Sequence, residues 1–466
     1  MSFGGIDLGS SSVKIAAYNE EGKLLGLTSQ EINPLHPQPG WWETDPEDVW
    51  RATRLALQEL MLKDNLHFDP MEAISISASG RENFPADANG KPLGNTLMGA
   101  DIRGEEFEIP PEGVEIPESW SLSCGHLRER MDPVMRLMWW RKNHPEIYAK
   151  MKQYPDWHGW LTLKLCGRNV SEHSLVGRWA IYDLRTRTWD AKRLAEYEIP
   201  EYLLPEIYNW GEVIGEVKNS VAMDLGLPKG VKVVVGGHDL NCAAIGAGVS
   251  KIGSVCLISG SYENMLIPTN LYPTASMLLR GLSITPHLGK IDKSIYAICP
   301  TGNAVLNWAR GILGFPLEEQ TSQLEGRGGQ PAPLMALPYL SGAMLYWQGG
   351  RKLRGVLLGL TLASTPIDII QAFMESIAYD HVNTFHMLHE EGVEISTVRA
   401  VGGGTRSTWW TQLKSDLLGV PIEVCTQPEP GTFGAALIAG YGLGVYNDLD
   451  DVGEKYSGTS KIYQPD

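Results

Sequence analysis

Residues 233–248 read VVVGGHDLNCAAIGAG, so that an apolar run leads through two glycines into a histidine, an acid and a helix-like segment. An acid at a strand-to-helix junction commonly caps the helix, because its carboxylate accepts hydrogen bonds from first-turn N–H groups. Paired glycines, however, let the backbone approach a ligand, and open α/β sheets place their chemistry at the carboxyl ends of strands. Asp239 is therefore either a cap or a catalytic carboxylate. His238 competes as a base, but successive strand side chains point to opposite faces, so we expect Asp239 alone to face a ligand and His238 to be a packed or hydrogen-bonded neighbour.

Three glycine turns at strand ends could bind phosphate through bare backbone N–H groups and hydroxyls. They are Asp7-Leu8-Gly9-Ser10-Ser11-Ser12, Ser259-Gly260-Ser261 and Gly402-Gly403-Gly404-Thr405. Each turn alone is more often an ordinary turn. Asp7 and Lys14 add a carboxylate and a cation around the first turn, as a Mg²⁺-bound triphosphate requires, although a surface strand with a turn is the simpler reading. The sequence contains neither a Walker loop nor the dinucleotide-binding glycine pattern.

The composition limits the classes of function. The chain has 466 residues, which favours two domains of about 200 residues each. Its net charge of −16 repels polyanions, so we expect neither nucleic acid nor an anionic membrane as a partner. The apolar segment 433–446 is too short and too glycine-rich to span a bilayer, and no basic-then-apolar leader precedes the first strand, so we expect a cytoplasmic protein.

The six cysteines are scattered without a C-x-x-C pair, which argues against a zinc site and a disulfide framework. We expect them to be reduced residues of the core. A homodimer is compatible with the sequence but is not indicated by it.

The order of elements predicts an α/β protein. FGGIDLG, SVKIAAYN and EEGKLLGLTSQEI are typical of a twisted hairpin sheet, and a helix is expected from Thr44 or Asp45 onward with Pro46 in its first turn. AISISAS is the next expected strand, and alternation continues to about residue 210. A comparable opening recurs after residue 248, with the strands GSVCLISGS and YENMLIPT, then two helical segments, the strand TVRAVGGG and the helix TRSTWWTQLKSDLLG.

These motifs resemble the FGGY carbohydrate kinases of the actin-like ATPase superfamily over residues 3–446. IDLGSSSVK resembles the first phosphate hairpin, with Lys14 in place of a more usual Arg, and ISGSYEN resembles the second. GGGTRSTWWTQLKSDLLGVPIEV and EPGTFGAALIAG are similar to the adenine-side segments. Two further segments resemble the family's signature sequences. In MDPVMRLMWWRKN, Arg136 stands where Lys is usual and Trp140 where an aliphatic residue is usual. In GVLLGLTLASTPIDIIQAFME, Phe373 stands where a small or aliphatic residue is common.

The resemblance implies two ribonuclease-H-like domains with a cleft between them, a sugar-binding domain at 1–248 and a nucleotide-binding domain at 249–466. It makes Asp239 the catalytic base and Asp7 the ligand of Mg²⁺. It places ATP against Gly9, Ser10, Ser11, Lys14, Gly260, Ser261, Gly403, Gly404 and Ser407, and the acceptor against Arg81, Glu82, Asp101 and Asp239. Because Gly99 stands where a Trp is common, we expect a wider acceptor pocket or another residue lining it.

The implied reaction is transfer of the γ-phosphoryl group of ATP to a hydroxyl of a sugar or polyol, most readily a pentulose such as xylulose, with fuculose-like sugars and polyols left open. Two alternatives remain. One is an actin-like nucleotide switch that hydrolyses ATP and binds protein partners, and the other is a family member that binds without transfer. The polar set of Arg81, Glu82, Asp101 and Asp239 favours the kinase, since a switch needs no sugar pocket.

Overall fold

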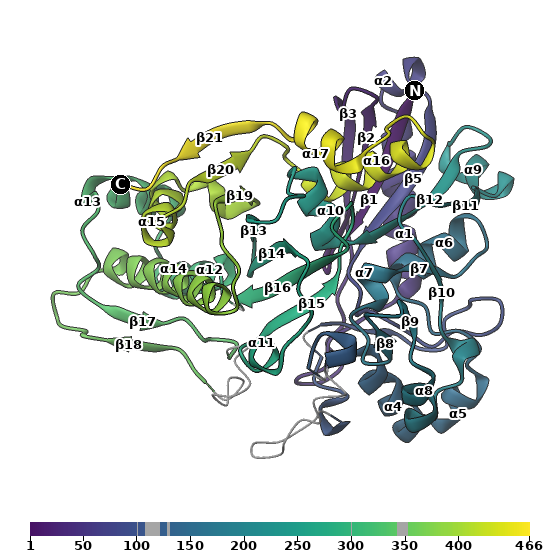
Figure 1. Cartoon of the computed structure of the whole chain (residues 1–466), viewed down its shortest axis with the longest axis horizontal. Helices are drawn as coiled ribbons and strands as arrows, with labels where there is room; N and C mark the ends of the chain where they lie inside the picture. Colours follow the sequence, from purple (N-terminus) through teal and green to yellow (C-terminus); the bar gives the residue numbers. More distant parts are fainter. Residues whose placement is uncertain (100, 108–121, 128–130, 300, 343–352) are drawn as a thin grey trace. The chain divides into compact units, whose positions relative to one another are not determined.

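The computed structural model describes residues 1–99, 101–107, 122–127, 131–299, 301–342 and 353–466 (Figure 1). The chain forms two compact units that interleave along the sequence. The first comprises residues 1–248, 285–293 and 429–456, and the second comprises 249–284, 294–428 and 457–466. The long first segment ends at Gly248, where the sequence suggested a boundary, and two later segments return to the first unit. A division of function between 1–248 and 249–466 stays a prediction.

The first unit is built on a six-stranded mixed sheet in the order β11-β12-β5-β1-β2-β3. Its strands are β1 (Ser2–Leu8), β2 (Ser12–Asn19), β3 (Leu24–Glu31), β5 (Met71–Ala78), β11 (Val213–Glu216) and β12 (Lys232–His238). β1, β2 and β3 pair antiparallel, whereas β1, β5 and β12 are parallel. The expected hairpin opening is therefore confirmed, and the parallel strands bring their carboxyl ends to one edge.

Side chains alternate between the two faces of this sheet. Ile6 and Ile15 belong to the apolar cluster that contains the helices α1 (Pro46–Met61), α6 (Trp157–Leu165) and α9 (Asn219–Leu225). Phe3 and Tyr18 belong instead to the cluster that contains α10 (Asp239–Gly246) and α16 (Pro430–Gly442). The two-residue period of the strands thus supplies a helical layer on each face.

The helix α1 forms where the sequence predicts it. Asp45 is its N-cap and accepts a hydrogen bond from the N–H of Glu47, and Pro46 occupies the first turn, where its missing donor costs nothing. The positions Val49, Ala52, Ala56, Leu57 and Leu60 are buried at helical spacing. The same unit also contains α2 (Asn65–Phe68), α4 (Pro133–Asn143), α5 (Pro145–Lys150), α7 (His173–Val176), α8 (Ala191–Tyr197) and α17 (Leu449–Ser457), with the strand pairs β4 (Glu43–Thr44) and β6 (Thr96–Leu97), β7 (Val170–Glu172) and β10 (Glu206–Tyr208), and β8 (Tyr182–Asp183) and β9 (Thr188–Trp189).

The second unit repeats the first sheet. Its strand order is β15-β16-β14-β13-β19-β20-β21, in which β13 pairs antiparallel with β14 and parallel with β19, as β1 pairs with β2 and β5. The strands are β13 (Ser254–Ser259), β14 (Glu263–Thr269), β15 (Leu282–Pro286), β16 (Lys293–Cys299), β19 (Thr397–Val401), β20 (Ile422–Cys425) and β21 (Thr459–Tyr463). This repeat confirms the expected pair of ribonuclease-H-like folds.

Helices of the second unit enclose a separate core. They are α11 (Ala275–Leu279), α12 (Asn303–Leu313), α13 (Leu317–Arg327), α14 (Pro366–Glu390) and α15 (Thr408–Leu418), with a short hairpin of β17 (Met335–Leu337) and β18 (Val356–Leu358). Phe373, a departure from the family signature, is buried in this core and packs edge-on against Trp308. All six cysteines are free, but only four of them are buried as expected, because Cys166 and Cys425 are partly exposed. Within the part of the chain that the structure describes, no helix is long and apolar enough to cross a membrane.

Candidate active site

Carboxylates gather where the parallel strands of the first unit end. Asp7 near the end of β1 is in register with Ser77 of β5, and Ser77 is in register with Gly237 of β12. The Ser77 hydroxyl donates a 2.5 Å hydrogen bond to Asp7 Oδ1. Burial raises the pKa of Asp7 to about 6, against the opposing effects of this hydrogen bond and of Lys14. Asp7 is thus a carboxylate that a cation would stabilise.

Asp239 is the first residue of α10 and follows β12 directly. Its Oδ1 accepts a hydrogen bond from the N–H of Leu240 at 2.7 Å, and 34% of its side chain is exposed. The pKa of Asp239 is raised from 3.8 to about 7, first by desolvation and then by the charge of Asp7. The structure therefore gives Asp239 both a local backbone contact and the near-neutral pKa that suits a general base.

The premise that the side chains of His238 and Asp239 point to opposite faces is wrong, whereas His238 is a packed neighbour of Asp239, as expected. His238 Nδ1 lies 3.2 Å from Asp239 Oδ1, because the strand ends at His238 and the helical turn at Asp239 abolishes the two-residue alternation. His238 is buried, and desolvation together with the charges of Arg178 and Arg81 holds its pKa well below the usual value. His238 is accordingly a neutral neighbour of the carboxylate.

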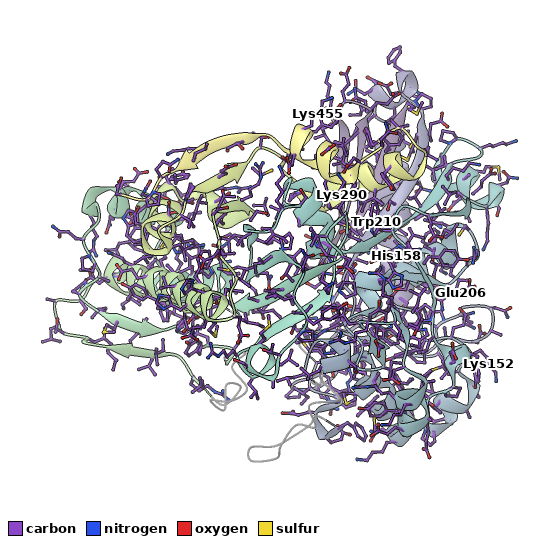
Figure 2. The ribbon with its side chains drawn as sticks, in the orientation of Figure 1. Lys152, His158, Glu206, Trp210, Lys290 and Lys455 are labelled. Carbon is purple, nitrogen blue, oxygen red and sulfur yellow. The ribbon has the colours of Figure 1, made fainter. Side chains whose placement is uncertain are left out.

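Buried polar side chains hold the backbone of this strand end. His158, labelled in Figure 2, accepts a hydrogen bond from the N–H of Gly236 at Nε2, and its Nδ1 lies 2.7 Å from the carbonyl oxygen of Val170. Ser174 Oγ accepts from the N–H of His238 and donates to Glu172. Burial lowers the pKa of His158 to about 4, so that the neutral ring can accept one bond and donate the other.

The first glycine turn closes tightly, with the N–H of Gly9 donating to the carbonyl of Ser12 at 3.0 Å, and it carries the exposed residues Ser10 and Ser11. Lys14 is paired with Asp7 in the β1–β2 register, and its Nζ lies 2.7 Å from Glu429 Oε2. These residues belong to the same unit as Asp239 and lie at the same strand ends.

The predicted acceptor residues Arg81 and Glu82 follow β5 and are buried, each with 7% exposure. Their charges act on His238 and Asp239, respectively, which places both near the end of β12. A Cβ built on Gly99 would lie 3.6 Å from Glu82 Oε1, so Gly99 borders the Glu82 carboxylate and has room for a side chain. Ala100, inside the segment assigned to the acceptor, lies outside the described residues.

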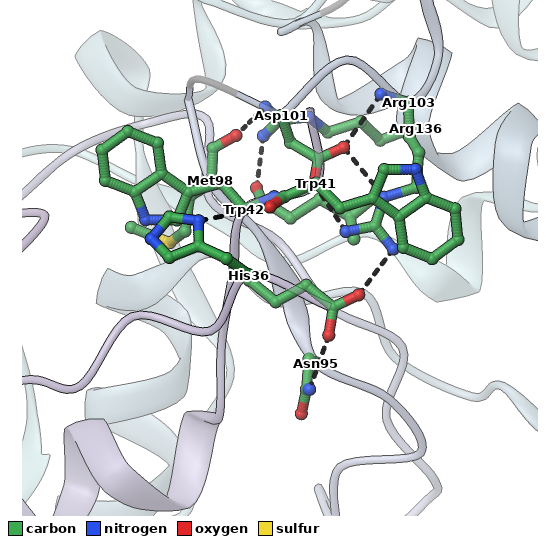
Figure 3. A network of polar contacts seen from close by, with 10 residues as sticks. His36, Trp41, Trp42, Asn95, Met98, Asp101, Arg103 and Arg136 are labelled. Atoms are coloured by element: carbon green, nitrogen blue, oxygen red, sulfur yellow. Dashed lines mark hydrogen bonds and ion pairs between the residues drawn. The ribbon is translucent and has the colours of Figure 1, made fainter. Parts of the chain in front are cut away.

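Asp101 is committed to bonds within the protein (Figure 3). It is fully buried, and its carboxylate accepts hydrogen bonds from the guanidinium and N–H of Arg103 and from the N–H of Trp42 at 2.5–2.8 Å. Arg103 also pairs with Glu43 and stacks on Trp41, with 3.9 Å between its Cζ and the ring centroid. Asp101 therefore anchors this segment, and a contact between Asp101 and an acceptor stays a prediction.

The predicted nucleotide residues of the second unit gather around Ser259. The turn at Gly260 and Ser261 is covered by residues 301–303, where a Cβ on Gly302 would lie 2.9 Å from the carbonyl oxygen of Ser261. Asn303 donates from its N–H and its amide to the carbonyl of Gly260. Beneath the turn, Ser259 Oγ donates to Glu263, and Lys414 Nζ lies 2.8 Å from the same buried carboxylate.

The two glycines after β19 have different surroundings, and their predicted place against a nucleotide stays a prediction. A Cβ on Gly404 would overlap Ser259 Oγ, whereas a Cβ on Gly403 would meet no atom within 4 Å. Ser407 is the N-cap of α15, and its hydroxyl accepts from the N–H of Trp410. Gly403 alone of the two has its Cβ direction free.

Several neighbours of these residues were not predicted from the sequence, namely Ser77, Glu429, Arg178 and residues 301–303. Glu429 directly precedes the Pro-Gly start of α16, and its side chain makes no capping hydrogen bond. A usable signal was present only for Asn303, because the segment GNAVLNWARGIL begins a helix directly after a glycine.

Comparison with known proteins identifies the family. Residues 2–246 match the N-terminal domain and residues 308–443 the C-terminal domain of the FGGY family of carbohydrate kinases. The chain is 27% identical to the L-xylulose/3-keto-L-gulonate kinase of Escherichia coli over 96% of this chain and 89% of the relative, and 26% identical to the xylulose kinase of Staphylococcus epidermidis strain RP62A over 99% and 92%. A crystal structure described as a xyloylose kinase from Brucella ovis has the same fold, with a TM-score of 0.90, 24% identity and coverage of 100% of this chain and 95% of that one. The chain therefore belongs to the FGGY family of carbohydrate kinases, phosphotransferases with an alcohol group as acceptor, and has the actin-like ATPase fold.

Proposed function

We propose that this chain transfers the γ-phosphoryl group of ATP to a hydroxyl of a pentulose such as xylulose, with other sugars and polyols as weaker acceptors. The observation that carries the proposal is Asp239, a partly exposed carboxylate at a strand end with a pKa of about 7 beside a second carboxylate, Asp7. The pentulose is favoured because two similar relatives are named for xylulose.

In this proposal Asp239 accepts the proton of the acceptor hydroxyl. The freed oxygen forms a bond to the γ-phosphorus while the bond from that phosphorus to the bridging oxygen breaks, and ADP leaves with the electron pair. A positioned base of this kind contributes about 10²- to 10⁴-fold to the rate. Arg81, Glu82 and Asp101 are assigned to the acceptor, on the strength of their place next to the end of β12 or in the segment around Gly99.

ATP is assigned to donors of the glycine turns. These are Gly9, Ser10, Ser11 and Lys14 in the first unit and Gly260, Ser261, Gly403, Gly404 and Ser407 in the second. Backbone N–H groups, hydroxyls and one lysine suit a phosphate chain in an acidic protein. For Gly404 the contribution is its backbone, because its Cβ direction is occupied by Ser259.

The residues around Asp7 fit a Mg²⁺ ion that arrives with the triphosphate. Within the described ranges no three metal-binding side chains are arranged to hold an ion by themselves. Mg²⁺ commonly takes one or two carboxylates and completes its shell with phosphate oxygens and water, which Asp7 would allow. When bound, the ion neutralises developing charge on the phosphates. Asp7 would have to lose its proton to hold it, and its pKa of about 6 permits this at neutral pH.

The test is a coupled assay of ADP release over ketoses, aldoses and polyols with Mg²⁺ and ATP, with Asp239→Asn as the matched control. The expected result is ADP release that depends on one class of acceptor and is lost in the variant. ADP release that ignores the acceptor would identify a nucleotide switch and contradict the proposal. Binding of ATP and a sugar without any turnover would identify a binding protein and contradict it equally.

A further inference from the structure

The side chain of Arg136 lies at the centre of the segments that carry the predicted acceptor residues. Arg136 belongs to α4 and has no exposed surface. Its Nη1 donates to the carbonyl oxygens of Arg81 at 2.7 Å and Leu97 at 2.5 Å, and its Nη2 donates to that of Met98 at 2.6 Å. Figure 3 labels Arg136 together with Met98 and Asp101. One guanidinium thus joins the segment after β5 to the end of β6 and the residue that follows it.

The three carbonyls lie in or shortly before the segments that carry the residues assigned to the acceptor. Arg81 is itself one of them and Glu82 follows it, while Met98 is followed by Gly99 and then, after one residue, by Asp101. Arg136 binds the backbone of both loops and not the side chains. A shift of Arg136 would therefore move the Glu82 carboxylate and the Gly99 wall together.

The burial of this charge needs a reason, because transfer of a cation out of water is costly unless hydrogen bonds and nearby anions replace the solvent. Desolvation lowers the pKa of Arg136, and the charges of Glu82 and Asp101 are among the groups that oppose that effect. Its Nε is buried without a hydrogen-bond partner among the described residues. The guanidinium is thus compensated mainly on the side that faces the two loops.

We propose that Arg136 is the positioning residue of the acceptor site, which fixes the distance between the Arg81–Glu82 segment and the Leu97–Gly99 segment by donating to the backbone of both. This inference rests on the proposed function for the ligand concerned, a sugar or polyol hydroxyl. The inference also explains how Arg136 can replace the Lys that is usual in the family signature. A lysine ammonium carries three donors on one nitrogen, whereas the guanidinium of Arg136 donates from two nitrogens to two separate backbone segments.

The test compares Arg136→Met, which removes the donors, with Arg136→Lys, which keeps three of them. Arg193→Met is the matched control, because Arg193 is also buried in the same unit but bonds instead to the carbonyl of Ala180, to Ser123 and to Asp190. Hydrogen–deuterium exchange of residues 79–84 and 95–99 is measured without any substrate. Arg136→Met should raise exchange in both segments, Arg136→Lys should raise it less, and Arg193→Met should leave both unchanged.

The kinetic arm uses the best acceptor of the wild-type screen. A misplacement of about 1 Å can cost about 10²-fold, so Arg136→Met should lower kcat/KM for the acceptor by about that factor while the KM for ATP stays unchanged, with partial rescue in Arg136→Lys. Unchanged exchange in the two segments, or equal loss for acceptor and ATP, would overturn the inference. Failure of the wild type to phosphorylate any acceptor would overturn the proposed function instead, and the exchange arm would still decide the role of Arg136 in the two loops.

Discussion

Lys14 and Glu429, 415 positions apart in the chain, form a hydrogen-bonded ion pair with 2.7 Å between Nζ and Oε2. Both act on Asp7, since the charge of Lys14 lowers the pKa of that carboxyl and the charge of Glu429 raises it. The predicted phosphate-binding residue Lys14 and its partner Glu429 therefore both influence Asp7, the predicted ligand of Mg²⁺. The two members of the pair should have opposite effects on the pH at which Asp7 loses its proton.

The first prediction concerns this opposition. Asp7 must be ionised to bind Mg²⁺, so the KM for Mg²⁺-ATP should rise as pH falls through about 6. Glu429→Gln removes a nearby negative charge, so it should lower the pKa of Asp7 and shift the rise in KM to lower pH. Lys14→Gln removes a positive charge, so it should raise the pKa of Asp7 and shift the rise in KM to higher pH. The KM for Mg²⁺-ATP measured between pH 5 and 8 in the three proteins checks this. If both variants shifted the rise in KM in the same direction, the assignment of Asp7 as the Mg²⁺ ligand would be contradicted.

The second prediction uses the raised pKa of Asp239. As a general base it must be deprotonated, so kcat/KM for the acceptor should fall as pH drops below about 7. Asp239→Asn should lose at least about 10²-fold in kcat and still bind ATP, since the amide oxygen can also accept the bond from Leu240. Near-normal turnover in this variant would leave Asp239 only a capping role.

The same shift predicts an effect on stability with a definite sign. Because the pKa of Asp239 is higher in the folded chain than its ordinary 3.8, the folded state retains a proton that the unfolded state has lost between pH 4 and 7. Stability due to this group is therefore present at low pH and declines as pH rises through that window. Asp239→Asn should have a higher Tm than the wild type at pH 8 and a smaller advantage at pH 5, as followed by thermal unfolding.

The third prediction separates the two glycines after β19. Gly404→Ala places a methyl group on Ser259 and should lower the Tm, whereas Gly403→Ala meets no protein atom and should leave the Tm unchanged. If Gly403 lies against ATP, its alanine variant should raise the KM for ATP while the acceptor KM stays the same. A rise in the acceptor KM alone would reverse the assignment of these loops.

The fourth prediction tests Gly99. Its Cβ position has ordinary contact distances to Glu82 and Met131, so Gly99→Ala should fold and work normally. Gly99→Trp adds roughly 150–250 Å² of aromatic surface beside Glu82, and overpacking of about 1–3 kcal/mol should weaken a five-carbon acceptor tenfold to a hundredfold. Smaller polyols should lose less. Activities on small and large acceptors, measured alongside the Tm, check this, and an unchanged ratio with a lowered Tm would refute the role in the pocket.

The hairpin strands and the glycine turns that open both sheets could be predicted because their signals are local, whereas β11, β15, β16, β20 and β21 were not predicted. The alternation of Phe3, Ile6 and Leu8 and the glycine turn after Asp7 depend on neighbours within a few residues. The same holds for α1, whose cap and proline are adjacent in sequence. The local rule failed at His238 and Asp239, where a strand and a helix share one junction and the strand period no longer applies.

The partners of the site residues could not be predicted, because each is set by tertiary packing. Asp101 is a carboxylate of the kind that often binds a ligand. Its oxygens, however, accept hydrogen bonds from the guanidinium of Arg103 and from the N–H of Trp42, which is 59 positions away. Arg136 carried a weak signal as a lone cation among Met, Leu and Trp in MDPVMRLMWW. Its donors reach the carbonyls of Arg81 and Leu97 only in the folded chain.

The helix α16 completes the first unit from the far end of the chain, as Figure 1 shows by its yellow colour beside the purple strand β1. Its backbone packs directly on that unit, since a Cβ on Gly5 would overlap the carbonyl of Thr432 and a Cβ on Gly434 would overlap that of Cys242. During synthesis, strands β1 to β12 and the helix α10 leave the ribosome long before residue 429, so the apolar face that α10 and α16 share is at first covered by α10 without α16. The core of the first unit can therefore be completed only after residues 249–284 and 294–428 of the second unit have been translated.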